Sequence, residues 1–188
     1  RILDILQEHN ARATFFVLGN RVDNFPNIIQ REYSQGHEIG SHSFSHPQIT
    51  TLTSDEIEYQ FAETEHRIQQ YVPYTTKLVR PPYGQITQSL KEVLQKTFVL
   101  WSIDTQDWKT RDKDAIVSEV LNNVKDGDII LMHDMYSTTA DACEELIPAL
   151  IERGYQLVTV SELLNAKEIT PVAGSVYSRV LSTGNAAS

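Results

Sequence analysis

A pair of histidines four residues apart is the first candidate for chemistry in this sequence. His42 and His46 enclose the tripeptide Ser43-Phe44-Ser45. Imidazole nitrogens are common zinc ligands, and this spacing lets both rings reach one metal if the segment is helical or tightly turned. The alternative is a chance pair of surface or capping histidines. Catalytic zinc has three protein ligands and an open position, so we expect a third ligand, a carboxylate, from elsewhere.

An arginine at the end of an apolar run is the second candidate. Arg80 follows Leu78-Val79 and precedes Pro81-Pro82-Tyr83-Gly84. A guanidinium is costly to bury unless it faces a carboxylate or phosphate, and an ordinary structural ion pair would also satisfy it. The two prolines restrict the backbone of the segment that follows. That segment could aim an amide N–H at a developing oxyanion, or it could be a plain connecting loop.

His133 is the third candidate because it closes the apolar run 129–132. A titratable imidazole at a strand end is in a suitable position for general acid catalysis. Asp107 could accept a hydrogen bond from this ring and fix its tautomer, while Trp108 would supply an apolar wall. A histidine in this position can also be an ordinary residue at the edge of the core.

These candidates share one position in the predicted fold, because each follows a predicted strand. Apolar runs typical of buried strands cover residues 13–18, 37–42, 77–80, 97–102, 128–133 and 156–160. Patterns typical of amphipathic helices cover residues 1–9, 26–36, 53–68, 87–95, 113–126 and 139–153. This alternation predicts parallel strands, and the carboxyl ends of parallel strands collect the active site. We expect an α/β barrel or doubly wound sheet. With about 25 to 35 residues per unit, a small or incomplete barrel fits best.

The composition excludes several classes of function. The 188 residues are 40% hydrophobic, which is enough for one sizeable core. The net charge of −9 argues against a nucleic-acid partner, because such proteins concentrate Lys and Arg. We expect no membrane span, since no apolar run approaches the roughly 20 residues that cross a bilayer. The single cysteine, Cys143, lies among apolar residues of a predicted helix and is expected to be a buried thiol.

Taken together, the motifs resemble those of the polysaccharide deacetylases of carbohydrate esterase family 4, the NodB-homology domain, and most closely the bacterial peptidoglycan N-acetylglucosamine deacetylases. The segment 42–46 is similar to the family's paired metal histidines, and the segment 80–84 to its arginine loop. Asp107-Trp108 and Leu131-Met132-His133 resemble the fourth and fifth motifs. The four motifs follow one another in the family's order, and the resemblance covers residues 1–165.

The family's first motif, a strand ending in Thr-Phe-Asp-Asp-Gly, is absent from this sequence. In the family it precedes the helix with which this sequence opens, and it carries the base aspartate and a metal-ligand aspartate. We expect the opening helix and this strand to begin upstream of Arg1, and this fragment alone to be inactive. The resemblance implies a distorted (β/α) barrel of about seven parallel strands, the first missing from this chain. We expect residues 1–168 to form the catalytic domain and residues 169–188 a C-terminal tail.

The activity implied by the resemblance is metal-dependent hydrolysis of a linear amide, which removes N-acetyl groups from N-acetylglucosamine residues of a cell-wall polysaccharide, in first place peptidoglycan. The cofactor implied is a divalent metal, Zn²⁺ or alternatively Co²⁺, bound by His42, His46 and an aspartate upstream of residue 1. Trp108 and Leu131 would enclose the acetyl methyl. The location implied is extracellular or in the cell envelope, by secretion or by an N-terminal anchor.

Four further residues receive catalytic roles by the same resemblance. His133, oriented by Asp107, would protonate the leaving amine. Arg80 would orient the upstream base carboxylate. The backbone N–H of Tyr83 would stabilise the oxyanion.

Other functions are compatible with these motifs. A chitooligosaccharide deacetylase or an acetylxylan esterase would use the same chemistry on a different substrate. A non-catalytic carbohydrate-binding module would keep the fold but lack the base and the complete metal site. A zinc ion that only stabilises the fold is disfavoured, because the candidate ligands lie at strand ends beside Arg80 and His133.

Overall fold

The computed structural model describes residues 1–181, which divide into two compact units. Unit 1 comprises residues 1–13, 101–169 and 178–181 of the described chain, and unit 2 comprises residues 14–100 and 170–177. Within each unit the paired strands run parallel. The predicted α/β class with parallel strands is therefore confirmed, while the seven-stranded barrel stays a prediction.

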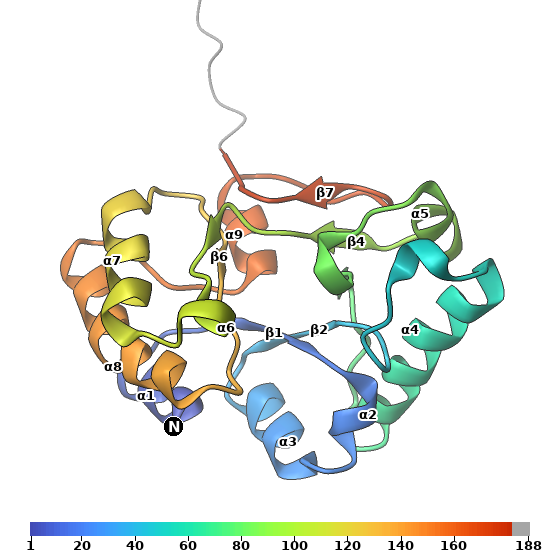
Figure 1. Ribbon diagram of the computed structural model, residues 1–188, viewed down its shortest axis with the longest axis horizontal. Helices are drawn as coiled ribbons and strands as arrows, with labels where there is room; N and C mark the ends of the chain where they lie inside the picture. Colours follow the sequence, from blue (N-terminus) through green and yellow to red (C-terminus); the bar gives the residue numbers. More distant parts are fainter. Residues whose placement is uncertain (182–188) are drawn as a thin grey trace, which may run out of the picture. The chain divides into compact units, whose positions relative to one another are not determined.

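Unit 2 is built on a parallel sheet of five strands (Figure 1). Their order is β1 (Thr14–Val17), β2 (Glu38–Ser41), β3 (Leu78–Val79), β4 (Thr97–Val99) and β7 (Val176–Tyr177). The helices of this unit are α2 (Gly19–Val22), α3 (Pro26–Ser34), α4 (Ser54–Gln69) and α5 (Gln88–Leu94), with 3₁₀ turns η1 (Ile49–Thr51) and η2 (Pro82–Gly84). Four of the six predicted strands and three of the predicted helices are thus in this unit, with ends that differ from the predicted ones by at most three residues.

Local sequence explains why α3 and α4 begin where they do. Pro26 occupies the first helical position of α3, where its missing N–H costs nothing. Thr53 caps α4, and Glu56 completes the predicted capping box by accepting from the Thr53 backbone N–H at 2.8 Å. Apolar residues of α4 then face the sheet, where Ile57 and Phe61 pack in one core with Val79 and Phe98.

Unit 1 contains a parallel strand pair and five helices. The strands are β5 (Ile103–Asp104) and β6 (Ile130–Leu131), and the helices are α1 (Ile2–Glu8), α6 (Asp107–Thr110), α7 (Lys113–Asn123), α8 (Ser137–Glu152) and α9 (Val160–Ala166). Helices α7 and α8 pack against each other around a core that includes Ile116, Val120 and Leu146 (Figure 1). Cys143 is a buried thiol, as predicted, and burial raises its pKa to about 12.

One predicted strand is shorter than expected and another is absent. The run 97–102 is interrupted after Val99, so that β4 and β5 belong to different sheets. Residues 156–159 form no strand, because Thr159 instead caps α9 and completes a capping box with Glu162. The pattern Thr-x-x-Glu at this point is a helix-start signal that outweighs the apolar alternation before it.

Part of the predicted C-terminal tail is ordered in the structure. β7 pairs with β4, where the backbone N–H of Phe98 donates to the Ser175 carbonyl at 2.8 Å. Val180 is buried. Residues 182–188 of the predicted tail lie outside the described residues, and the predicted domain boundary at residue 168 stays a prediction. No helix in the described part of the chain has the length and apolarity that a membrane crossing requires.

Candidate functional site: a histidine pair and an aspartate–histidine pair

The structure brings His42 and His46 together in unit 2. Both follow β2, and their ring centroids are 4.9 Å apart at an interplanar angle of 69°. The ring of His46 also meets the ring of Tyr83 edge to face, with centroids 4.7 Å apart. The segment between the histidines is a tight turn and not a helix. Of the two geometries that the spacing allows, the turn is the one observed.

A backbone carbonyl fixes the tautomer of His42. Its Nδ1 atom lies 2.5 Å from the carbonyl oxygen of Arg80. A carbonyl oxygen can only accept, so Nδ1 carries the proton and the lone pair of the neutral ring is on Nε2. This is the arrangement that metal-binding histidines adopt in proteins, with one ring nitrogen donating to a backbone carbonyl and the other available to the metal.

Three residues around the pair have left-handed backbone conformations without being glycine. The φ angles are 72° at Ser43, 61° at His46 and 57° at Tyr83. Each such residue costs about 1 kcal/mol or more, and these conformations concentrate at functional sites. The Ser43 hydroxyl accepts a hydrogen bond from the His46 backbone N–H at 3.0 Å and so supports the turn.

Arg80 is buried with its guanidinium against the sheet. Its Nη2 donates to the Leu100 carbonyl at 3.0 Å, its Nε donates to the Val99 carbonyl at 3.4 Å, and its Cζ lies 4.3 Å from the centroid of the Phe16 ring. Burial lowers the pKa of Arg80 to about 10, which leaves the side chain protonated at neutral pH. The stacking on Phe16 adds a cation–π contact.

In unit 1, Asp107 and His133 form a hydrogen-bonded pair. Asp107 Oδ1 lies 2.7 Å from His133 Nδ1, and Oδ2 accepts from the His133 backbone N–H at 2.6 Å. Thr139 and the backbone N–H of Trp108 also donate to this carboxylate, at 2.7 and 2.8 Å. The predicted hydrogen bond is present, and it directs the protonated Nδ1 towards Asp107 and leaves Nε2 for other chemistry.

The electrostatics favour a charged Asp107. Its side chain is fully buried, which alone would raise the pKa of the carboxyl group. Hydrogen bonds from the ring and backbone of His133 and from Thr139 outweigh that cost, so that the net pKa is lowered. Asp107 is therefore an ionised hydrogen-bond acceptor at neutral pH.

The two residues predicted to bind the acetyl group differ in exposure. Trp108 is 49% exposed on α6, whereas Leu131 is 8% exposed in β6. Trp108 offers a large apolar surface to a ligand, while Leu131 can offer only its edge. Tyr83 is also well exposed, at 60%.

The residues described in the structure fit a metal only in part. They include no group of three or more His, Cys, Asp or Glu side chains placed to hold one metal ion. The histidine pair offers two imidazole nitrogens, a ligand type that suits zinc, cobalt and related ions. A third protein ligand would have to come from residues outside those described.

Two polar residues of these clusters escaped the sequence-based prediction. Thr139 donates to Asp107 from α8, and Gln60 on α4 binds the backbone of the turn between the histidines. Each contact spans 15 residues or more, as the hydrogen-bond partners show. No local pattern in the sequence indicates either.

Comparison with known proteins identifies the family. A family model described as polysaccharide deacetylase matches residues 1–99. Peptidoglycan-N-acetylmuramic acid deacetylase PdaC of Bacillus subtilis (strain 168) is 45% identical over 168 residues, which cover 89% of this chain and 36% of that protein. The chain belongs to the polysaccharide deacetylase family. Peptidoglycan-N-acetylglucosamine deacetylase PgdA of Listeria monocytogenes serotype 1/2a (strain 10403S) is 39% identical over 166 residues, which cover 88% of this chain and 36% of that protein.

A solved structure supports the same family and fold. A family 4 acetyl xylan esterase from Clostridium thermocellum, in complex with a cobalt ion, superposes with a TM-score of 0.90 at 35% identity, covering 95% of this chain and 90% of that chain. The polysaccharide deacetylase chain described here thus spans only 36% of the length of PdaC and PgdA, but nearly all of this solved chain. The family model ends at residue 99, so it includes the histidine pair and Arg80 and stops before Asp107.

Proposed function

We propose that this chain is the catalytic domain of a metal-dependent deacetylase that removes N-acetyl groups from cell-wall peptidoglycan. Membership in the polysaccharide deacetylase family supports the reaction type, and the peptidoglycan deacetylases among its relatives support the substrate. The observation that carries the proposal is the His42–His46 pair. Its rings lie close together, and the Arg80 carbonyl holds His42 in the tautomer that a metal ligand needs.

The metal in this proposal is Zn²⁺, with Co²⁺ as the alternative. His42 and His46 would each give one ring nitrogen, and an aspartate upstream of Arg1 would give the carboxylate ligand. When bound, such a metal supplies Lewis acidity, which lowers the pKa of water and polarises the acetamide carbonyl. The cobalt ion in the acetyl xylan esterase structure supports a site that accepts more than one divalent metal.

In this proposal the arginine loop, residues 80–84, stabilises the oxyanion and orients the base. Tyr83 has a left-handed backbone conformation with a φ of 57°, and its N–H would stabilise the oxyanion of the tetrahedral intermediate. A hydrogen bond of this type is typically worth about 3 to 4 kcal/mol in the transition state. Arg80, which stays charged, would orient the carboxylate of the upstream base.

Proton delivery to the leaving amine is assigned to His133. With Nδ1 donating to an ionised Asp107, a protonated ring presents its second N–H at Nε2, and Asp107 stabilises the imidazolium that this requires. Trp108 and the edge of Leu131 would bound the space for the acetyl methyl and disfavour longer acyl groups.

The sugar that carries the acetyl group has two candidates. We propose N-acetylglucosamine, as in PgdA. N-acetylmuramic acid is the second candidate, favoured by the higher identity to PdaC, 45% against 39%. Both sugars alternate along peptidoglycan strands, so the two candidates share a polymer and differ in the substituent next to the amide. In either case the enzyme would act outside the cytoplasm, in the envelope or the extracellular space.

The test is acetate release by a form of the protein that carries the upstream residues, loaded with zinc. The substrates are peptidoglycan, N-acetylglucosamine oligomers, N-acetylmuramic acid-containing oligomers, chitin oligomers and acetylated xylan. Wild type should release acetate from peptidoglycan, and His42→Ala and His133→Ala should each lose at least about 100-fold in rate. His66→Ala, an exposed histidine on α4, is the matched control.

Different outcomes would favour the alternatives. Release from acetylated xylan alone would replace the peptidoglycan deacetylase with an acetylxylan esterase, and release from chitin oligomers alone would favour a chitooligosaccharide deacetylase. Binding of peptidoglycan without acetate release from any substrate, in folded and zinc-loaded protein, would favour a non-catalytic carbohydrate-binding module.

A further inference from the structure

The turn between the histidines is held through backbone groups on both its carbonyl side and its amide side. The N–H of Gly19 donates to the Ser43 carbonyl and the N–H of Asn20 to the Phe44 carbonyl, each at 3.0 Å. These two bonds fix the carbonyl side of the turn from the start of α2. The amide side of the turn is held by a single side chain from another helix.

That side chain is Gln60 on α4. Its Oε1 accepts from the backbone N–H of Phe44 at 3.0 Å and of Ser45 at 2.9 Å, and its Nε2 lies 3.0 Å from the Ser45 hydroxyl. Two N–H donors converge on one atom, so that atom must be the amide oxygen. An isolated turn would expose these two N–H groups to water, whereas here one side chain satisfies both.

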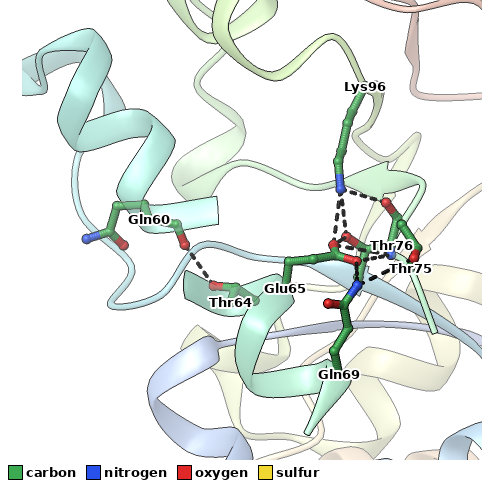
Figure 2. Close-up of polar contacts among 7 residues, drawn as sticks. All are labelled: Gln60, Thr64, Glu65, Gln69, Thr75, Thr76 and Lys96. Carbon is green, nitrogen blue, oxygen red and sulfur yellow. Dashed lines mark hydrogen bonds and ion pairs between the residues drawn. The ribbon is translucent and has the colours of Figure 1, made fainter. Parts of the chain in front are cut away.

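The helix that carries Gln60 is itself tied to the sheet. Figure 2 shows the Thr64 hydroxyl donating to the Gln60 carbonyl at 2.8 Å, one turn along α4. The next residue, Glu65, accepts from the Thr76 backbone N–H at 2.9 Å and from Lys96 Nζ at 3.1 Å. Lys96 also donates to the Thr76 carbonyl at 2.6 Å. Because Lys96 immediately precedes β4 and Thr76 lies two residues before the start of β3, this network fixes α4 against the sheet.

We propose that Gln60 is a positioning residue that holds the His42–His46 turn in its metal-binding geometry. The inference rests on the proposed function, because it assumes that the two histidines bind a metal. Gln60 hydrogen-bonds the segment between the two rings. It acts on the two amides between them, and a shift of either amide would move both ring nitrogens relative to each other. The turn contains left-handed residues at Ser43 and His46, so it needs such support to persist.

Zinc affinity tests the inference with Gln60→Met, Gln60→Glu and Gln69→Met. Methionine has a similar length but no acceptor, whereas glutamate keeps an oxygen for the two N–H groups. Gln69 lies on the same helix and hydrogen-bonds Glu65, away from the turn, which makes it the matched control. In competition with a chromogenic chelator, Gln60→Met should bind zinc about 10- to 100-fold more weakly than wild type. The other two variants should stay within about threefold of wild type.

Hydrogen exchange in the metal-free protein separates positioning from general destabilisation. The amides of Phe44 and Ser45 should lose protection in Gln60→Met and keep it in Gln60→Glu. Visible spectra of the cobalt-substituted proteins should report a changed ligand geometry only in Gln60→Met.

Several results would overturn the inference. Wild-type zinc affinity in Gln60→Met, or equal losses in Gln60→Met and Gln69→Met, would remove the positioning role. If wild type binds zinc and Gln60→Met binds it weakly, but wild type releases no acetate, the proposed reaction fails and the positioning role stands. If wild type binds no zinc, both fail.

Discussion

Asp107 accepts hydrogen bonds from both the ring and the backbone N–H of His133, at 2.7 and 2.6 Å. The two bonds fix the position of the histidine as well as the tautomer of its ring. Thr139 adds a third bond to the same carboxylate from α8. A buried carboxylate surrounded by donors has no neutral substitute of the same shape, because an amide would bring two hydrogens towards those donors.

We therefore expect Asp107→Asn to change the tautomer of His133. In wild type, nitrogen-15 NMR of the neutral ring should report the proton on Nδ1, and in the variant a substantial population should carry it on Nε2. Unfolding in urea should show a loss of about 1 to 3 kcal/mol, since one or more buried donors lose their acceptor. Thr139→Val, which removes only one donor, is the control and should leave the tautomer unchanged. An unchanged tautomer in Asp107→Asn would show that other contacts orient the ring.

The same carboxylate predicts how stability depends on pH. The folded pKa of Asp107 lies below its ordinary value of 3.8, so the folded state binds this proton less tightly than the unfolded state. The stabilisation is thus complete above about pH 3.8 and is lost as the pH falls through the lowered folded pKa. In urea unfolding between pH 2 and 6, the free energy of unfolding should fall more steeply with decreasing pH in wild type than in Asp107→Asn. Identical pH dependences in the two proteins would mean that the pKa of Asp107 is the same in the folded and unfolded states.

Arg80 should contribute to stability independently of any reaction. Arg80→Met removes the charge and leaves the carbonyls of Val99 and Leu100 without their donor, so we expect a loss of about 2 to 4 kcal/mol in urea unfolding. Arg80→Lys keeps one donor and should lose less. Arg153 also donates to a backbone carbonyl but is exposed, and Arg153→Met should cost less than about 1 kcal/mol. Equal losses at the two arginines would contradict the importance of burial.

The sequence was sufficient to predict the elements whose signals are local. The capping box of Thr53 and Glu56 and the apolar runs around β1, β2 and β3 predict the framework of unit 2, and the four-residue spacing of His42 and His46 predicts their proximity. These signals depend on neighbouring residues, and the surrounding structure reinforces them.

The features that sequence reasoning missed depend on distant partners. β7 contains one apolar residue and one tyrosine, and it is a strand because backbone groups of β4 pair with it. Gln60 and Thr139 look like ordinary helix residues until the turn and the carboxylate that they bind are in place. Tertiary contacts of this kind leave no periodic pattern in the sequence.

Gly19 should be essential to the packing of the histidine turn. A Cβ atom at this position would lie 2.6 Å from Phe44 Cδ2 and 2.9 Å from the Cα of Thr64. Backbone cannot yield as a flexible side chain can, so Gly19→Ala should cost about 1 to 3 kcal/mol and weaken zinc binding by shifting Phe44. Gly154→Ala has no steric contact but a φ of 87°, so it should cost about 1 kcal/mol and leave zinc affinity unchanged. Urea unfolding curves and zinc titrations of both variants test these two expectations. Unaltered zinc affinity in Gly19→Ala would show that the packing of Gly19 against Phe44 does not influence zinc binding.

His46 offers a test of the left-handed backbone at the proposed metal site. At an ordinary helix position glycine is less stable than alanine by about 1 kcal/mol, but at a φ of 61° the order should reverse. We expect metal-free His46→Gly to be more stable than His46→Ala by about 1 kcal/mol in urea unfolding. Both variants should lose zinc affinity, because both lack the imidazole. Exposed His66 near the end of α4 gives the opposite expectation, with His66→Ala more stable than His66→Gly and zinc affinity unchanged in both. If alanine were the more stable residue at both positions, the turn would have to relax out of the left-handed region when the imidazole is removed. His46 would then owe its conformation to the contacts of its ring with His42 and Tyr83, and not to the backbone of the turn.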